Sequence, residues 1–343
     1  MTADTINPII GENSQESIAK IFGDFNFDSV VEKITDGKFS PDSQNIINRM
    51  TALFLGELKT AFALIGTIAI LIVISAFINN LNQSFKKDAV TEAAGMTLFV
   101  YISAIAATAF KTAADYVMAM IGDVTLFVHS IIPSMAALSI SGGEVVTATM
   151  AHPVIFFVCS CAGTIIRNFI TPLVLLRAVC VLLCAITKNE SLNEFAELFS
   201  KLHKTVLAFS MSLFAGILGI TSFAAASFDS LAARGVKFAI SASVPVVGGS
   251  ISEAMSSVAG SAMLLRNAVG LGGVIVIFAT FAIPLLKVWA LSLAFRLTAA
   301  FTAPVSEKRV TEILRKLGDC VDMLFSSIAC MGTIMIIAIA AIL

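Results

Sequence analysis

Charged side chains are scarce in this chain. Asp, Glu, Lys and Arg make up 13% of its 343 residues, and the mean hydropathy is +0.93. A soluble globular domain carries about a quarter charged residues, so this composition excludes one. The formal net charge of −1 also excludes broad electrostatic capture of nucleic acid, which needs an excess of Lys and Arg.

Local catalytic signatures are missing as well. The sequence contains no H-E-x-x-H zinc motif, no G-x-x-x-x-G-K-[ST] phosphate loop and no C-x-x-C pair. No catalytic residue, cofactor or metal site is therefore predicted, and an intramembrane enzyme is the least favoured function. Any work driven by ATP has to come from a partner.

The six cysteines all lie in or beside apolar stretches. Cys180 and Cys184 are four residues apart and share a helix face, which is one arrangement for a metal or redox pair. No His or carboxylate lies within five residues of them to complete a site. We therefore interpret them as small buried apolar residues.

Long apolar runs dominate the chain from about residue 60 to its end, and several of them hold 17 or more residues without a charge. About 20 apolar residues in a helix cross a hydrocarbon core of about 30 Å. The sequence thus predicts an all-α, polytopic integral membrane helix bundle over residues 60–343, preceded by a polar, acidic, partly helical region over residues 1–59. The predicted spans are residues 60–79, 93–110, 145–166, 168–187, 205–227, 268–286, 288–304 and 323–343.

Two further stretches, residues 116–140 and 238–261, are interrupted by proline, glycine or charge. They are either kinked spans or re-entrant helix pairs, and both readings place them inside the bundle, where protein or water covers a broken backbone. The expected number of membrane helices is therefore eight to ten. Residues 190–204 and 307–322 are charged and amphipathic, and we expect them to be two surface helices.

An internal repeat is indicated by prolines at equal spacing. Pro133 and Pro172 are 39 residues apart, as are Pro245 and Pro284, and the flanks FITPLVLL and FAIPLLKV agree. We predict two parallel units, residues 93–204 and 205–322, followed by the final span 323–343.

The distribution of basic residues predicts the orientation. Residues 86–87, 188–204 and 308–316 carry the basic loops expected on the cytoplasmic side. Residues 1–59 carry nine acidic and five basic residues, and we expect this region and the C-terminus outside the cytoplasm. Residues 1–59 hold no apolar stretch suited to a signal peptide, so either such a segment precedes the sequence, which we favour, or the first span directs insertion.

Arg177 lies near the middle of a predicted span. A central Arg costs at least about 2.5–3.5 kcal/mol to insert, so its side chain must face protein, water or a counter-charge. Asp115, Asp123 and Asp229, near the ends of other spans, are the candidate partners. The pair would form either a polar pathway or a buried structural ion pair.

Three other polar residues occur in apolar stretches. Arg296 lies on a more amphipathic segment and is expected to reach an interface with its charged end. His129 and His152 lie near Pro133 and Pro153, and we favour a hydrogen-bonded role in helix packing over a proton relay.

Small residues are concentrated in the second half of the chain. They let helix backbones approach closely where water supplies no hydrophobic drive, either within the bundle or against another membrane protein. The candidate contact residues are Gly248, Gly249, Gly260, Gly270, Gly272 and Gly273.

Three stretches of the sequence are distinctive. The most specific runs from SVPVVGGSISEAMSSVAG to LSLAFRLTAA, residues 243–300. The other two are GELKTAFALIGTIAILIVISAFINNLNQSF, residues 56–85, and FVHSIIPSMAALSISGG, residues 127–143. On these stretches the sequence, from about Phe39 onward, resembles the stage III sporulation protein AE family of endospore-forming bacteria.

The resemblance implies a multi-pass protein of the mother-cell membrane around the forespore. It implies a non-enzymatic subunit of a transenvelope channel or secretion complex that supports forespore development and late forespore gene expression. The implied partners are other stage III sporulation proteins, one of them an ATPase, and a forespore membrane protein. The alternative is an autonomous secondary transporter of a small solute, with a midplane polar site around Arg177.

Overall fold

The computed structural model describes residues 20–21, 31–32, 34–36, 43–84, 89–187, 189–243, 248–304 and 308–343. These residues form helices, with no strand among them. The long elements are α3 (Ser43–Ser84), α4 (Ala89–Ser141), α7 (Ser191–Ser243), α8 (Gly248–Thr302) and α9 (Lys308–Ala340). Between α4 and α7 a single rod is built from η3 (Thr147–Ala151), α5 (His152–Ile165), η4 (Ile166–Ile170) and α6 (Thr171–Thr187).

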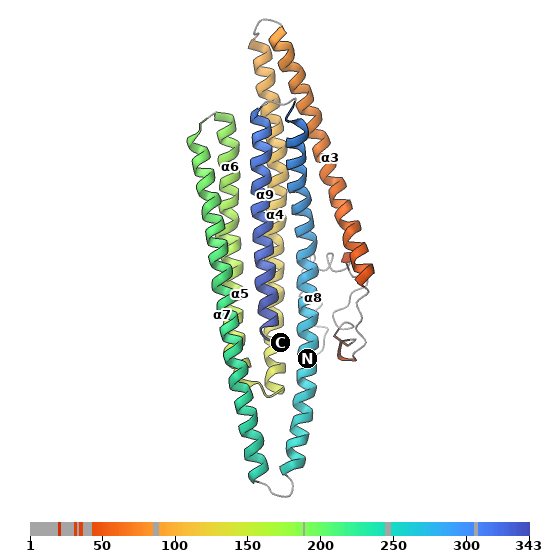
Figure 1. Ribbon diagram of the computed structural model, residues 1–343, viewed down its shortest axis with the longest axis vertical. Coiled ribbons are helices and arrows are strands. Elements are labelled where there is room, and N and C mark those ends of the chain that lie inside the picture. The colour runs from red at the N-terminus through yellow and green to blue at the C-terminus, as the bar shows by residue number, and fades with distance from the viewer. Residues whose placement is uncertain are drawn as a thin grey trace.

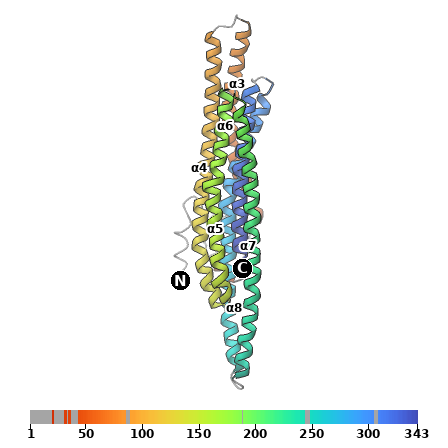
Figure 2. The ribbon, with the colours of Figure 1, turned by 90° about the vertical axis from the view of Figure 1, so that its left-hand side faces the viewer.

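Successive rods alternate in direction, so the molecule is an elongated up-and-down bundle (Figures 1 and 2). In Figure 1, α3, the η3–α6 rod and α8 rise, whereas α4, α7 and α9 descend. The end of α3 and the start of α4, the end of α6 and the start of α7, and the end of α8 and the start of α9 therefore lie toward one end, which we call the upper end. The end of α4 and the start of η3, and the end of α7 and the start of α8, lie toward the lower end.

The predicted fold class is confirmed, but the number of spans is smaller than eight to ten. The described residues contain six helices long and apolar enough to cross a membrane. Predicted spans 93–110 and 116–140, for example, are one 53-residue helix, α4. Such a helix is about 80 Å long, and a straight rod crosses a core of about 30 Å only once. A lone charge or proline did not end the helix, because neighbouring rods and lipid both favour continued backbone hydrogen bonding.

The two predicted surface helices are also not separate elements. Residues 190–204 continue into α7, and residues 307–322 continue into α9. The doubtful stretch 116–140 lies within the continuous α4, and the stretch 238–261 is where α7 ends and α8 begins. Pro245, part of the proposed repeat, lies outside the described residues.

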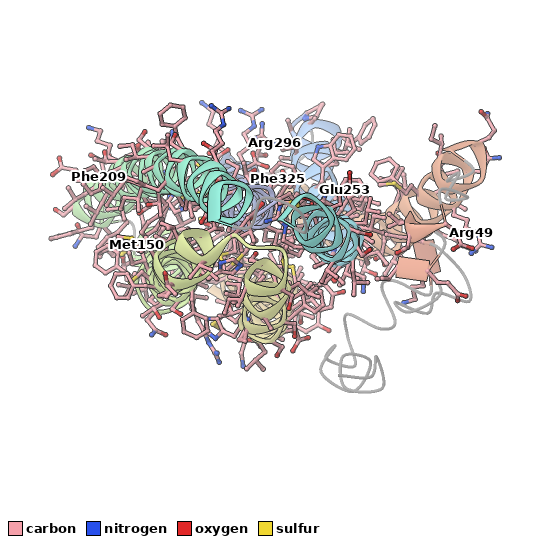
Figure 3. The ribbon with its side chains drawn as sticks, turned by 90° about the horizontal axis from the view of Figure 1, so that it is seen from below. Arg49, Met150, Phe209, Glu253, Arg296 and Phe325 are labelled. Carbon is pink, nitrogen blue, oxygen red and sulfur yellow. The ribbon has the colours of Figure 1, made fainter. Side chains whose placement is uncertain are left out.

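The centre of the bundle is made by α8 and α9. In their most apolar stretches, 67% of the α8 residues and 61% of the α9 residues are buried, against 17% for α7. α7 instead exposes large apolar side chains such as Phe209, Ile220 and Phe223, and Figure 3 shows Phe209 on the outside of the bundle. A face of this kind is stable against lipid and not against water.

Two π-helical turns carry the third rod past its prolines. Each turn ends two residues before a proline, Pro153 and Pro172, and a wider turn accommodates the missing N–H of proline. In each, the residue before the proline bonds the carbonyl five positions earlier with its side chain: His152 Nδ1 to Thr147 O at 2.9 Å, and Thr171 Oγ1 to Ile166 O at 2.8 Å. Predicted spans 145–166 and 168–187 are therefore one rod.

The candidate glycines differ in their surroundings. A Cβ at Gly273 would lie 2.8 Å from Ile131 Cδ1, and one at Gly270 would collide with Leu343, whereas one at Gly260 would meet nothing within 4 Å. Gly272 is buried. Gly248 and Gly249 are the first two residues of α8. Another glycine, Gly332 on α9, faces the Phe281 ring of α8, where a Cβ would lie 3.1 Å from the ring.

We expect Gly332→Val to lower the free energy of unfolding by about 1–3 kcal/mol, because extra methyl groups overpack the α8–α9 contact. Gly219→Val is the matched control, since a Cβ at Gly219 meets nothing within 4 Å. Thermal unfolding of the two purified variants in detergent measures the difference. Equal shifts would contradict this account of the packing.

Candidate functional site: a charged cavity beside the central helix

Arg177 on α6 is 5% exposed and points at α9. Its Nη1 lies 3.0 Å from Met323 Sδ and 3.7 Å from Cys320 Sγ. Its Nη2 lies 3.9 Å from Asp319 Oδ2, which is an ion pair but too long for a hydrogen bond, and its Nε has no hydrogen-bond partner in the described structure. Sulfur is a weak acceptor. The buried guanidinium therefore lacks a strong acceptor among the described residues.

The neighbouring carboxylates are held by Arg296 on α8. Its Nη2 donates to Asp319 Oδ1 at 3.2 Å and also contacts the carboxylate of Asp322. Ser292, one turn earlier on α8, donates to Asp322 as well. Two arginines and two aspartates thus form one network between α6, α8 and α9.

His203 on α7 completes the polar group and was not singled out from the sequence. It is 1% exposed, and its Nε2 lies 3.0 Å from Ser327 Oγ. The Ser327 hydroxyl donates to the carbonyl of Met323 at 2.8 Å, so Nε2 must be the donor to Ser327. Nδ1 is then left without a partner in the described structure.

These side chains line a cavity of about 810 Å³ between α6, α7, α8 and α9. The charged and histidine side chains in its wall are Arg177, Glu197, His203, Lys204, Arg296, Asp319 and Asp322. Arg296, which is half exposed, lies at the outer edge of the bundle (Figure 3). The Arg296 side chain can therefore reach the edge of the bundle, as expected, and still form ion pairs with Asp319 and Asp322.

The structure places Asp319 against Arg177, where the sequence suggested Asp115, Asp123 or Asp229. Asp115 is exposed on α4, and Asp123 is partly buried on the same helix. Asp229 is buried on α7, and its two carboxylate oxygens accept from the backbone N–H groups of Val146 and Thr147 at 2.8 Å. It caps the lower end of the third rod, where a carboxylate satisfies otherwise unpaired donors.

The two histidines singled out in the sequence, His129 and His152, lie outside the cavity wall. His129 Nε2 is 2.7 Å from Ser160 Oγ, and its ring stacks on Phe156 with centroids 4.3 Å apart. His152 bonds its own rod, as described above. The cysteines of the suggested pair, Cys180 and Cys184, are half-buried free thiols.

A second charged pair, at the lower end, was not found from the sequence. Arg266 on α8, whose side chain is 6% exposed, contacts the carboxylate of Glu144 in the α4–η3 connection, and its Nη2 donates to the carbonyl of Leu343 at 2.8 Å. The pair ties together a connection, α8 and the end of α9.

A signal for the missed partner of Arg177 was present in the sequence. Asp319 and Asp322 are spaced i, i+3 on the charged segment 307–322 and therefore share a helix face. Interpreting that segment as a separate surface helix removed it from consideration.

Comparison with known proteins decides the family. A sequence model described as stage III sporulation protein AE matches residues 25–343. The chain belongs to the stage III sporulation protein AE family. It is 26% identical over 308 residues to the stage III sporulation protein AE of Bacillus subtilis (strain 168), covering 90% of this chain and 77% of that protein. No solved structure matches it.

Family membership confirms the resemblance seen in the sequence. This is a family of sporulation proteins and is not a known enzyme family. With six apolar helices of membrane length, the chain is a multi-pass membrane protein of sporulation.

We expect Arg266→Met to lower the free energy of unfolding by about 3–5 kcal/mol, since it leaves the Glu144 carboxylate without its partner in a largely buried position. Thermal unfolding in detergent provides the measurement. Arg315→Met, on the exposed face of α9, is the matched control for loss of one positive charge.

The double variant Arg266→Met/Glu144→Gln separates charge from packing. It should recover part of the loss, because position 144 no longer carries an unpaired charge, whereas the Leu343 carbonyl still lacks its Arg266 donor. A double variant as unstable as Arg266→Met alone would show that the ion pair is not the cause.

Proposed function

We propose that this chain is a non-enzymatic membrane subunit of a transenvelope channel or secretion complex used in endospore formation. In this role it supports forespore development and late forespore gene expression. The observation that carries the proposal is the family match over residues 25–343, which includes all of the apolar helices from α3 to α9. The chain acts in the mother-cell membrane that surrounds the forespore.

The partners we propose are other stage III sporulation proteins, including an ATPase, and a forespore membrane protein reached through the complex. The letters AE in the family name, which the Bacillus subtilis relative shares, fit a member of a set of such proteins. The chain has no nucleotide-binding motif of its own, so a separate ATPase is the simplest source of energy.

The proposed orientation has the upper end in the cytoplasm. Toward this end lie the described basic residues Lys201, Lys204, Lys308, Arg309, Arg315 and Lys316. Short cytoplasmic loops carry an excess of Lys and Arg. An even number of crossings then leaves the region before α3 and the end of α9 on the same, extracytoplasmic side.

The proposed repeat is supported by the way α7 and α9 start. Both begin toward the upper end and descend (Figure 1), and Lys316 Nζ on α9 donates to Asn193 Oδ1 on α7 at 2.6 Å. α4 with the η3–α6 rod, and α7 with α8, each cross down and up. Two crossings per unit is the even number that parallel copies require.

A transporter acting alone is the second candidate function, and the charged cavity is the observation that favours it. Buried Arg and His side chains around a cavity of about 810 Å³ between membrane helices are typical of substrate or ion pathways. The two candidates differ in whether the purified chain works without partners.

The proposed orientation predicts opposite accessibility at the two ends of the bundle. In a chain with its six cysteines replaced by alanine and produced in the plasma membrane of non-sporulating cells, Ser141→Cys at the lower end should react with a membrane-impermeant maleimide in intact cells. Glu190→Cys, in the α6–α7 connection, should react only after the cells are opened. Both positions are exposed, so a permeant maleimide should label both. Reversed labelling would reject the orientation.

The assembly role predicts dependence on partners. A tagged chain from sporulating cells should retain other stage III sporulation proteins, and cells without the chain should fail to form heat-resistant spores. Liposomes containing the chain alone should take up no more metabolite than empty liposomes. Uptake by the chain alone that Arg177→Ala abolishes would instead establish the transporter.

A further inference from the structure

The cavity around Arg177 has two chemically different ends. On α7 its wall passes from Glu197, Ser200, His203 and Lys204 to Leu207, Ala208 and Met211. On α9 it passes from the charged Asp319 and Asp322 to a stretch without charge, which consists of Met323, Ser326, Ala329, Cys330 and Thr333. Both helices descend from the upper end, so the polar wall is uppermost on both (Figure 1). The 14 residues from Glu197 to Met211 span about 21 Å along α7.

The polar end lacks an acceptor. Arg177 is 5% exposed, its only carboxylate contact among the described residues is Asp319 at 3.9 Å, and Asp319 is already engaged by Arg296 at 3.2 Å. An unpaired buried charge is costly, and an oxyanion gives a guanidinium its strongest hydrogen bonds. A phosphate oxygen in the cavity would therefore satisfy a group that the described residues leave unsatisfied.

The charged side chains in the cavity wall favour one class of phosphate-bearing ligand over others. Three cations, Arg177, Lys204 and Arg296, are matched by three carboxylates, Glu197, Asp319 and Asp322. A ligand that carries only negative charge would be repelled by those carboxylates. A ligand with a phosphate and an ammonium group can pair with both signs.

The apolar end and the depth of the cavity point to the bilayer as the source. The charge-free run of α9 begins at Met323, directly after Asp322, so the polar end lies where a headgroup would lie beside a span that starts there. α7, which forms one wall, is the least buried of the rods named above and faces outward. A lipid can reach the cavity sideways along this helix.

We propose that the cavity binds one phospholipid with a zwitterionic headgroup of the phosphoethanolamine type. The phosphate accepts from Arg177 and Lys204, the ammonium faces the carboxylates, and an acyl chain lies along Leu207, Ala208 and Met211. This inference goes beyond the assembly role and does not rest on it, because it concerns the purified chain.

The test begins with the full chain, purified in mild detergent from a host with phosphatidylethanolamine in its membrane. Native mass spectrometry should show one retained phospholipid per chain. After delipidation, added phosphatidylethanolamine should raise the unfolding temperature. Inorganic phosphate and glycerophosphoethanolamine, the headgroup without its tails, should not.

Variants separate the two ends of the cavity. Arg177→Gln should weaken lipid binding by at least about tenfold, as expected for loss of a charge-assisted hydrogen bond. Lys204→Gln should act in the same direction, and Lys201→Gln, three residues away and outside the cavity wall, should not. Ala208→Trp should fill the tail region and abolish retention, whereas Ala224→Trp, exposed on the same helix, should retain lipid.

Three results would overturn the proposal. No retained phospholipid together with no thermal shift would remove the site. Equal shifts from inorganic phosphate and lipid would make it a free-anion site. Equal or tighter binding of anionic phosphatidylglycerol would reject the zwitterionic assignment. Because Lys201→Gln and Ala224→Trp leave the cavity wall intact, a loss of lipid in them as well would show that the variants act by general destabilisation, and would count against the site.

Discussion

Hydrocarbon offers no hydrogen-bond partner, and the organisation of this protein depends on that constraint. Each backbone group within the bilayer must bond inside its own rod, which explains why the described chain is helical and why helices run on past charges and prolines. The π-turns before Pro153 and Pro172 are local solutions to the same demand. So is Asp229, which satisfies two N–H groups where the third rod begins.

Most buried charged side chains described here also have a partner inside the protein, but not all of them do. Arg266 and Glu144 pair near the lower end, and Arg296 pairs with Asp319 and Asp322 higher up. Arg177 stands apart, because its neighbours are sulfur atoms and a shared carboxylate. A membrane protein without known enzymatic activity can still contain a costly buried charge such as Arg177 if that charge binds a ligand.

The membrane character, the helical class and the burial of Arg177 against other helices could be predicted from the sequence, because each rests on composition or on a single charge in a long apolar run. The number of rods could not. Breaks were placed at residues such as Lys111 and Arg167, but both are exposed on continuous helices and cost little there. The partner of Arg177 was missed for a related reason: whether Asp319 on α9 or Asp229 on α7 meets it depends on which rods are neighbours, and local patterns do not carry that information.

The lower end of the bundle is uneven. Asp229 lies level with the start of η3, yet α7 continues to Ser243, 14 residues or about 21 Å farther. α8 returns from the same depth, so these two helices project beyond their neighbours (Figures 1 and 2). Two joined helices form a stiffer post than one, and whatever approaches from that side meets the post first. The length of this projection sets the smallest distance at which anything approaching along the bundle axis can contact the other rods.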